Sequence, residues 1–114
     1  MAGKILREAK GLDGTMILMS DRVVIHRPGL FNYFKYGKNA KHEIPFSAIS
    51  EVVFAAATMM TQGSIELVRS GRSREERKVG SNANVMKFRK RDNDQFEAIK
   101  EKIFEMLNNQ QRRQ

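Results

Sequence analysis

The spacing of apolar residues changes near the C-terminus, and this change limits the folds open to the chain. Between residues 91 and 109, large apolar side chains recur every three or four positions, as on one side of an amphipathic helix. Asp92 and Gln95 fit a capping box at the start of that helix. Burying five such side chains stabilises a fold by about 8–15 kcal/mol before the cost of ordering them is subtracted. We therefore expect the helix to pack into the core through Phe96, Ile99, Ile103, Phe104 and Leu107.

Upstream of this helix, short apolar segments alternate with turn-forming residues, a pattern typical of antiparallel β-structure. Ser20-Asp21 predicts a tight hairpin between two of the segments. Pro45 predicts an edge position or a bend for its own strand, because proline has no N–H group to donate to a sheet. The seven expected strands are Gly14–Ser20, Arg22–Arg27, Lys41–Phe46, Glu51–Thr58, Gln62–Ser70, Glu75–Val79 and Asn84–Lys90. The pattern predicts a mainly β (all-β or α+β) fold in which one C-terminal amphipathic helix closes the open end of a bent antiparallel sheet.

The chain has 114 residues, enough for one domain with a single core. We expect the folded domain to span residues 13–108, preceded by an N-terminal segment (residues 1–12) and followed by a frayed tail (residues 109–114). The N-terminal segment permits either a short helix or a loose extension. No apolar run approaches the roughly 20 residues that span a bilayer, and the first residues lack the apolar stretch of a secretory signal. We therefore expect a cytoplasmic protein, with peripheral attachment at the inner face of the membrane as the alternative.

Side chains suited to catalysis or metal binding are scarce. The chain has no cysteine, which excludes disulfides, thiolate nucleophiles and sulfur ligands. Its two histidines, His26 and His42, flank one predicted connection between strands, and no ligand or catalytic motif surrounds them, so solvated positions at a sheet edge are expected. Glycine-rich phosphate loops and nucleophile elbows are also missing. We expect a non-enzymatic protein without a metal, a cofactor or a small-molecule substrate.

Basic side chains outnumber acidic ones by 21 to 13, which gives a formal net charge of +8. Such an excess predicts attraction to polyanions, or no more than solubility. The basic residues are concentrated in the segment 27–43 and in two further clusters. These clusters are Arg72, Arg74, Arg77 and Lys78, and then Lys87, Arg89, Lys90 and Arg91.

The segment 27–43, RPGLFNYFKYGKNAKHE, combines four aromatic with four basic side chains. If residues 30–36 form a strand, alternate side chains point to opposite faces, and only one face can meet the core. The set expected to point inward is Leu30, Asn32, Phe34 and Tyr36. Phe31 and Tyr33 are then exposed beside Lys35, and the tip Gly37–Lys41 presents two further lysines. The candidate binding residues of the chain are Arg27, Phe31, Tyr33, Lys35, Lys38, Lys41, Arg72, Arg74, Arg77 and Lys78.

The order of segments resembles the bacterial pleckstrin-homology-like (PH-like) domain family over residues 12–107. The resemblance is carried by ILMSDRVVIHRPGLF, EIPFSAISEVVF, TQGSIELVRSG and NVMKFRKRDNDQFEAIKEKI. The matching positions are Asp21-Arg22, Ile44-Pro45-Phe46 with Ile49, Gly63 with Ile65, Met86 with Phe88, and Phe96. The resemblance implies two nearly orthogonal antiparallel sheets, a seven-stranded sandwich or barrel, capped at one end by the helix. It also implies frequent self-association.

Three interpretations of the basic and aromatic residues follow. The first is an interaction module for a protein partner or a second copy of the chain, because exposed aromatics with arginine are typical of interface hot spots. The second is peripheral binding to anionic membrane lipids through the same surface. Relatives of the family grip inositol phosphates with a long basic loop between their first two strands, whereas Ser20-Asp21 is a tight, acidic turn. The third is non-specific nucleic-acid binding, for which no recognition motif is present.

Overall fold

The computed structural model of the chain describes residues 4–29, 34–35, 37–69 and 84–112. Within these residues the chain forms seven strands, three short 3-10 helices and one long C-terminal helix. The strands are β1 (Ile5–Lys10), β2 (Thr15–Met19), β3 (Arg22–His26), β4 (Lys41–Pro45), β5 (Ile49–Ala55), β6 (Gly63–Arg69) and β7 (Val85–Phe88). The helices are η1 (Gly37–Ala40), η2 (Phe46–Ala48), η4 (Lys90–Asp92) and α3 (Asn93–Arg112).

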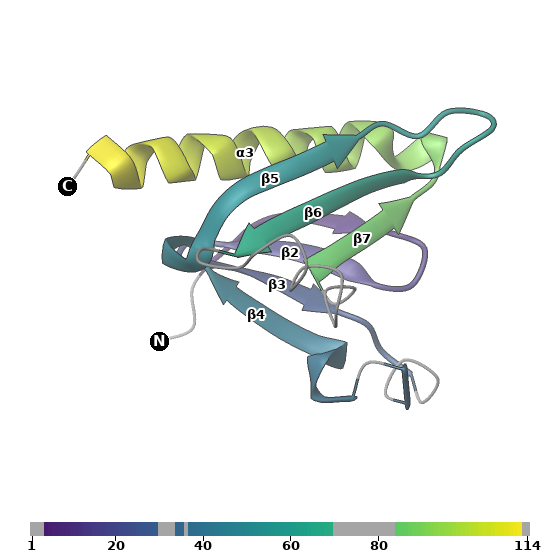
Figure 1. The fold of residues 1–114 in the computed structure, drawn as a ribbon, viewed down its shortest axis with the longest axis horizontal. Coiled ribbons are helices and arrows are strands. Elements are labelled where there is room, and N and C mark those ends of the chain that lie inside the picture. The colour runs from purple at the N-terminus through teal and green to yellow at the C-terminus, as the bar shows by residue number, and fades with distance from the viewer. Residues whose placement is uncertain (1–3, 30–33, 36, 70–83, 113–114) are drawn as a thin grey trace.

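The strands form two antiparallel sheets, one with the order β1-β2-β3-β4 and one with the order β5-β6-β7, and α3 lies along β5 (Figure 1). The predicted mainly β fold with a C-terminal helix is therefore confirmed. Every neighbouring pair is consecutive in the sequence, so each sheet is a simple meander. Pro45 ends β4, which is an edge strand, as the missing N–H group of proline predicts.

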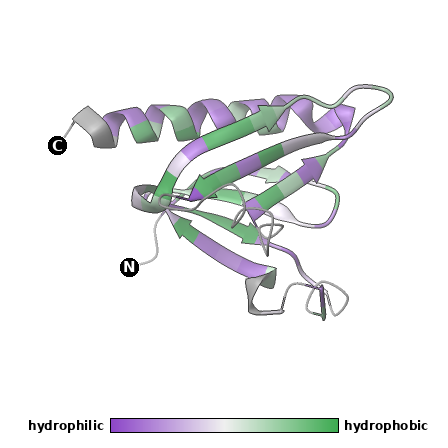
Figure 2. Cartoon of the chain, in the orientation of Figure 1, coloured by the Kyte–Doolittle hydropathy of each residue, from purple (hydrophilic) through white to green (hydrophobic). Residues whose placement is uncertain are grey.

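The core lies between the two sheets and the inner side of α3. It combines Leu18, Ile25 and Ile44 from the first sheet with Ile65 and Met86 from the second, all fully buried. The apolar positions run along the strands, while apolar and polar residues alternate around α3 (Figure 2). Each helix turn therefore presents apolar side chains to the sheets and polar ones to water.

α3 is part of the core, as its apolar stripe predicts, and it contacts β1, β5 and β6. Three predicted positions, Phe96, Ile99 and Ile103, have no exposed surface. The ring of Phe96 stacks on that of Phe88 in β7, with 4.2 Å between centroids and 7° between planes. The expectation for Phe104 is wrong, because this side chain is 39% exposed. Successive residues of a helix differ by about 100°, which places Phe104 at the margin of the stripe centred near Ile103.

The N-terminal segment is part of the first sheet, where β1 pairs with β2 and Ala9 is buried opposite Met16. The predicted domain start at residue 13 is therefore too late. A register shift between Ile5 and Arg7 interrupts the alternation of side chains, which explains why the strand has no period of two in the sequence. At the other end, α3 continues to Arg112, beyond the predicted end at residue 108, because no proline or glycine stops it. The predicted strand Glu75–Val79 lies outside the described residues.

The connection between β3 and β4 spans residues 27–40, and the two strands pair directly from His26 with Lys41. The predicted strand over residues 30–36 is wrong at its described positions, since residues 34 and 35 have helical backbone. Phe34 was expected in the core and is instead 77% exposed. Gly29 and Gly37 have φ values of +98° and +62°, which only glycine adopts readily. These two residues turn the chain where a strand would need extended backbone.

Candidate functional site

Arg27, a predicted contact residue, is buried and does not lie on a surface. Only 1% of it is exposed, and its Nε donates a hydrogen bond to Oδ2 of Asp13 at 3.1 Å. Its Nη2 donates to the carbonyl oxygen of Val85. The direction of the side chain follows from strand alternation, because Val23 and Ile25 of the preceding strand also point inward. Arg27 therefore joins the end of β3 to the β1–β2 turn and to β7 of the other sheet.

We expect Arg27→Ala to lower the free energy of unfolding by about 1–3 kcal/mol, because the carbonyl of Val85 would lose its buried donor. Arg27→Lys should not restore stability, since an ammonium group lacks the fork that reaches both partners. Arg22→Ala is the matched control on the same strand, where Arg22 pairs with the exposed carboxylates of Asp21 and Glu43. Surface pairs of this kind contribute at most about 1 kcal/mol. Denaturant unfolding measures all three variants, and equal losses for Arg27→Ala and Arg22→Ala would contradict the buried role.

The other predicted contact residues are only partly placed. Lys35 and Lys41 are exposed, and Lys41 stands on the outer face of the sheet opposite His26. Lys38 belongs to η1, but its side chain lies outside the described part of the structure. The remaining six candidates lie outside the described residues: Phe31, Tyr33, Arg72, Arg74, Arg77 and Lys78. The structure therefore does not bring the predicted set together into one surface.

The two histidines do not converge. His42 pairs with Ile25 and shares its face of the sheet, whereas His26 pairs with Lys41 and is exposed on the other face. Adjacent strand positions point to opposite faces, so the short distance along the strands does not bring the two rings together. In residues 4–29, 34–35, 37–69 and 84–112, no three histidine, cysteine, aspartate or glutamate side chains are grouped as metal ligands.

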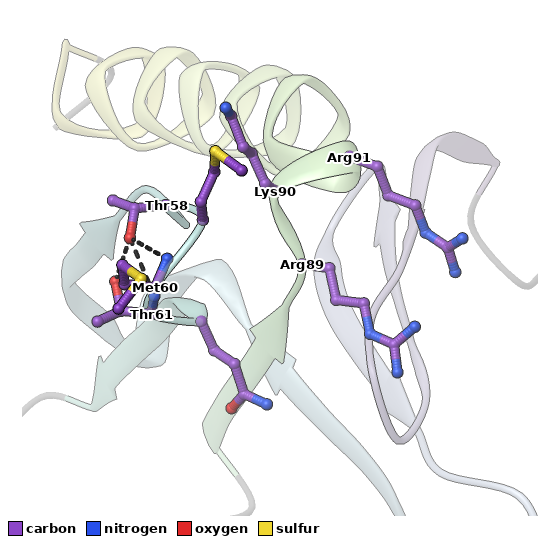
Figure 3. A pocket seen from close by; sticks show the side chains of 8 residues that line it. Thr58, Met60, Thr61, Arg89, Lys90 and Arg91 are labelled. Atoms are coloured by element: carbon purple, nitrogen blue, oxygen red, sulfur yellow. Dashed lines mark hydrogen bonds between the residues drawn. The ribbon is translucent and has the colours of Figure 1, made fainter.

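A shallow pocket of about 430 Å³ lies between the β5–β6 loop and the segment that joins β7 to α3 (Figure 3). From the loop, Met59 and Met60 contribute the most exposed large apolar side chains among the described residues, at 87% and 92%. From the other segment come three exposed basic residues, Arg89, Lys90 and Arg91. We call these five residues the methionine–basic surface.

The loop that carries the methionines is held by several hydrogen bonds of its own. The N–H of Thr58 donates to the carbonyl oxygen of Thr61 at 2.9 Å. Oγ1 of Thr58 accepts hydrogen bonds from the N–H groups of Met60 and Thr61, at 3.1 and 2.9 Å (Figure 3). The two threonine hydroxyls are also hydrogen-bonded to each other at 2.8 Å. A hydroxyl that caps nearby backbone donors stabilises a tight turn, so the methionines are displayed by an ordered tip.

Asn93, the first residue of α3, fixes this loop to the basic segment. Its Oδ1 accepts from the N–H of Ala57 at 2.8 Å, and its Nδ2 donates to the carbonyl oxygen of Ala57 at 2.9 Å. Ala57 is almost fully buried at the base of the loop. Gly63 closes the other side of the loop, where a Cβ would lie 2.3 Å from Cε2 of Phe88. The two halves of the methionine–basic surface are therefore held at a constant separation.

The basic half of the surface is available to a ligand. Arg89, Lys90 and Arg91 are all exposed, and within the described part of the chain they form no ion pair. Asp92 and Asp94 follow at the start of α3, where negative charge stabilises the positive end of the helix dipole. Of the three cations that line the pocket, Lys90 lies on the side of the apolar tip, whereas Arg89 and Arg91 extend away from Met60 (Figure 3).

This surface differs from the predicted one. The cluster at residues 87–91 is visible in the sequence as a basic run, but it was not among the candidate binding residues. Met59 and Met60 were missed. The signal that finds them is the segment TMMT between two strands, because threonine hydroxyls can hydrogen-bond backbone groups within a turn.

Comparison with known proteins gives no significant match: no family model matches the chain, and no curated protein or solved structure does so. The resemblance to the PH-like family therefore stays a prediction. In the described residues, none of the helices has the length and apolar character required to cross a bilayer.

Proposed function

We propose that the protein is a non-enzymatic module that binds reversibly to anionic lipid bilayers through the methionine–basic surface. The observation that carries this proposal is the pair of adjacent methionines, 87% and 92% exposed, on an ordered tip that lines one pocket with three exposed cations. Apolar side chains at this exposure are stabilised by leaving water. The neighbouring cations indicate that the partner is negatively charged, because they attract an anionic surface.

The hydrogen bonds of the loop favour a bilayer as that surface. A loop that enters the interfacial region loses part of the water around its backbone, and each polar group left without a partner is costly. Thr58 and Thr61 already provide acceptors within the loop for the N–H groups of Thr58, Met60 and Thr61. These three N–H groups therefore keep their hydrogen bonds when the loop leaves water.

The magnitudes indicate that insertion and charge contribute comparably. Fully burying a methionine side chain is worth about 1.5–3 kcal/mol, so two methionines that enter halfway contribute about 1.5–3 kcal/mol together. A basic residue near an anionic leaflet contributes about 1 kcal/mol, hence about 3 kcal/mol for three residues. We therefore expect binding that needs anionic lipid, weakens as the salt concentration rises and weakens at least about tenfold when either half of the surface is removed. The net charge of +8 acts in the same direction over longer distances.

Replacing Met59 and Met60 together by serine is expected to weaken binding to anionic vesicles about tenfold to a hundredfold, since about 1.5–3 kcal/mol of apolar transfer is lost. Phe104→Ser is the matched control, because Phe104 is a partly exposed apolar residue on α3, outside the surface. Vesicle co-sedimentation measures the affinities. Equal affinities for the double variant and the unmodified protein would overturn insertion of the methionines.

Protein contact through the 27–42 segment is the second candidate, and the exposure of Phe34 at 77% beside exposed Lys35 supports it. It predicts association of the chain with itself or a partner that does not depend on lipid. Light scattering over a range of protein concentrations tests self-association, and a monomer at every concentration would contradict it. Nucleic acid is disfavoured at the methionine–basic surface because none of its five residues is an aromatic on which a base could stack.

A further inference from the structure

We propose that the β1–β2 turn is a second contact of the protein with the bilayer, with Leu12 as its apolar residue. This inference rests on the proposed function and adds the orientation in which the protein docks. An isolated exposed leucine is ordinary on a protein surface. Leu12, which is 38% exposed, gains a role from its position at one end of a row of cations whose other end is the methionine pair.

The row is built by β7 and the residues after it. The N–H of Leu12 donates to the carbonyl oxygen of Lys87 at 2.9 Å, so the turn lies directly against β7. Lys87 is exposed, and Arg89 follows two residues later on the same side of the extended chain. Arg89 and Arg91 extend away from Met60 and on the side of the purple β1–β2 hairpin, whereas Lys90 points in the opposite direction (Figure 3). Arg89 and Arg91 thus lie on the side of the β1–β2 hairpin, and Lys90 lies on the side of the methionine loop (Figure 3).

The turn is rigid enough to hold Leu12 in place. The N–H of Gly11 donates to the carbonyl oxygen of Gly14 at 2.8 Å. A Cβ on Gly11 would lie 2.6 Å from Sδ of Met86, and one on Gly14 would lie 2.4 Å from the carbonyl oxygen of His26. Both glycines therefore pack against the two sheets too closely for a side chain. Leu12, between them, is partly exposed to water.

Two apolar contacts with cations between them define a docking plane. The β1–β2 turn, the β5–β6 loop and the start of α3 lie at the same end of the molecule (Figure 1). A single insertion at Met59 and Met60 would let the protein rotate about that point. A second contact at Leu12 prevents this rotation and turns Lys87, Arg89 and Arg91 toward the headgroups. The occupant is the anionic bilayer itself, because an apolar pair flanking a basic row complements a surface that is anionic above and apolar below.

The absence of cysteine from the chain makes the orientation measurable by single labels. The labelled sites are Leu12→Cys, Met60→Cys and Ser47→Cys, each carrying an environment-sensitive fluorophore. Ser47 is exposed on η2, at the opposite end of β5 from the methionine loop. Phe46, the first residue of η2, donates its N–H to the carbonyl oxygen of Asp21 in the β2–β3 turn. This turn and the β1–β2 turn lie at opposite ends of β2, so η2 is far from the β1–β2 turn.

The probes are vesicles of phosphatidylcholine with phosphatidylglycerol, and vesicles of phosphatidylcholine alone. With the anionic vesicles, the emission of labels at positions 12 and 60 should shift to shorter wavelength, while the label at 47 should not change. A shift at 60 without one at 12 would overturn this inference and leave the proposed function standing. No shift at 60 would overturn both, and so would a shift at all three positions, because that indicates adsorption without orientation.

Leu12→Ser supplies a readout without a label. Its affinity for anionic vesicles should fall about threefold to tenfold relative to the unmodified protein, because only the exposed part of the Leu12 side chain leaves water on binding. An unchanged affinity would overturn the role of Leu12, whatever the methionine variants show. The thermal unfolding temperature of the variant should match that of the unmodified protein. If the variant is much less stable, the emission shifts of the labelled proteins decide whether Leu12 contacts the bilayer.

Discussion

Phe96→Ala is expected to lower the free energy of unfolding by about 3–5 kcal/mol, the cost of truncating a large core aromatic. Phe96 has no exposed surface, and its ring stacks on Phe88 with centroids 4.2 Å apart. Phe88 lies 5.8 Å from Phe54 in turn, so the three rings connect α3 to both edge strands of the second sheet. The variant removes the ring by which α3 stacks on that sheet and leaves a cavity behind. Denaturant unfolding followed by circular dichroism measures the loss.

Phe104→Ala is the control for this prediction, because it removes the same group from the same helix at a position that is 39% exposed. We expect its effect on the free energy of unfolding to be below about 1 kcal/mol. Similar losses for the two variants would mean that α3 does not face the sheets through Phe96. The placement of the methionine–basic surface would then also be wrong, since Asn93 on the same helix fixes it.

Replacing Arg89, Lys90 and Arg91 together by glutamine is expected to weaken binding to anionic vesicles about a hundredfold, because about 3 kcal/mol of attraction is removed. The three side chains are exposed and form no ion pair in the described part of the chain. Their replacement should therefore leave the fold intact. The variant should also bind with a weaker dependence on salt, since fewer charges face the lipid.

The matched control replaces Lys4, Lys35 and Lys41 by glutamine, which removes the same charge from exposed positions elsewhere. It should bind anionic vesicles within about threefold of the unmodified protein if location matters more than net charge. Membrane binding through the 27–42 segment predicts the opposite order, with the larger loss in the control. Equal losses in the two triple variants would indicate attraction by net charge alone, without a defined surface.

Regular periodicity accounts for the parts of the fold that the sequence predicts. The strands from β2 to β7 that lie in the described residues coincide with predicted segments, because their buried residues alternate or form short apolar runs. β1 was missed for a physical reason: the register shift between Ile5 and Arg7 removes the alternation that marks a strand. Phe104 was misplaced because a stripe read from spacing alone has no defined width.

The candidate site was harder to predict because it depends on contacts between distant residues. Arg27 has a basic side chain in a basic segment, and only the positions of Asp13 and Val85 show that it is buried. The exposure of Met59 and Met60 likewise depends on Asn93, which holds the base of the loop from the far end of the sequence. Methionine usually lies in a core. Residue type alone therefore predicts buried positions for Met59 and Met60, whereas the hydrogen bonds of Thr58 form the turn that exposes them.

Co-sedimentation of the unmodified protein with vesicles of increasing phosphatidylglycerol content, at low and at high ionic strength, tests the central claim most directly. The methionine–basic surface predicts no binding to neutral vesicles, binding that increases with the anionic fraction, and partial release when salt is added. Absence of binding to anionic vesicles at low ionic strength, or equal binding to neutral and anionic vesicles, would contradict it.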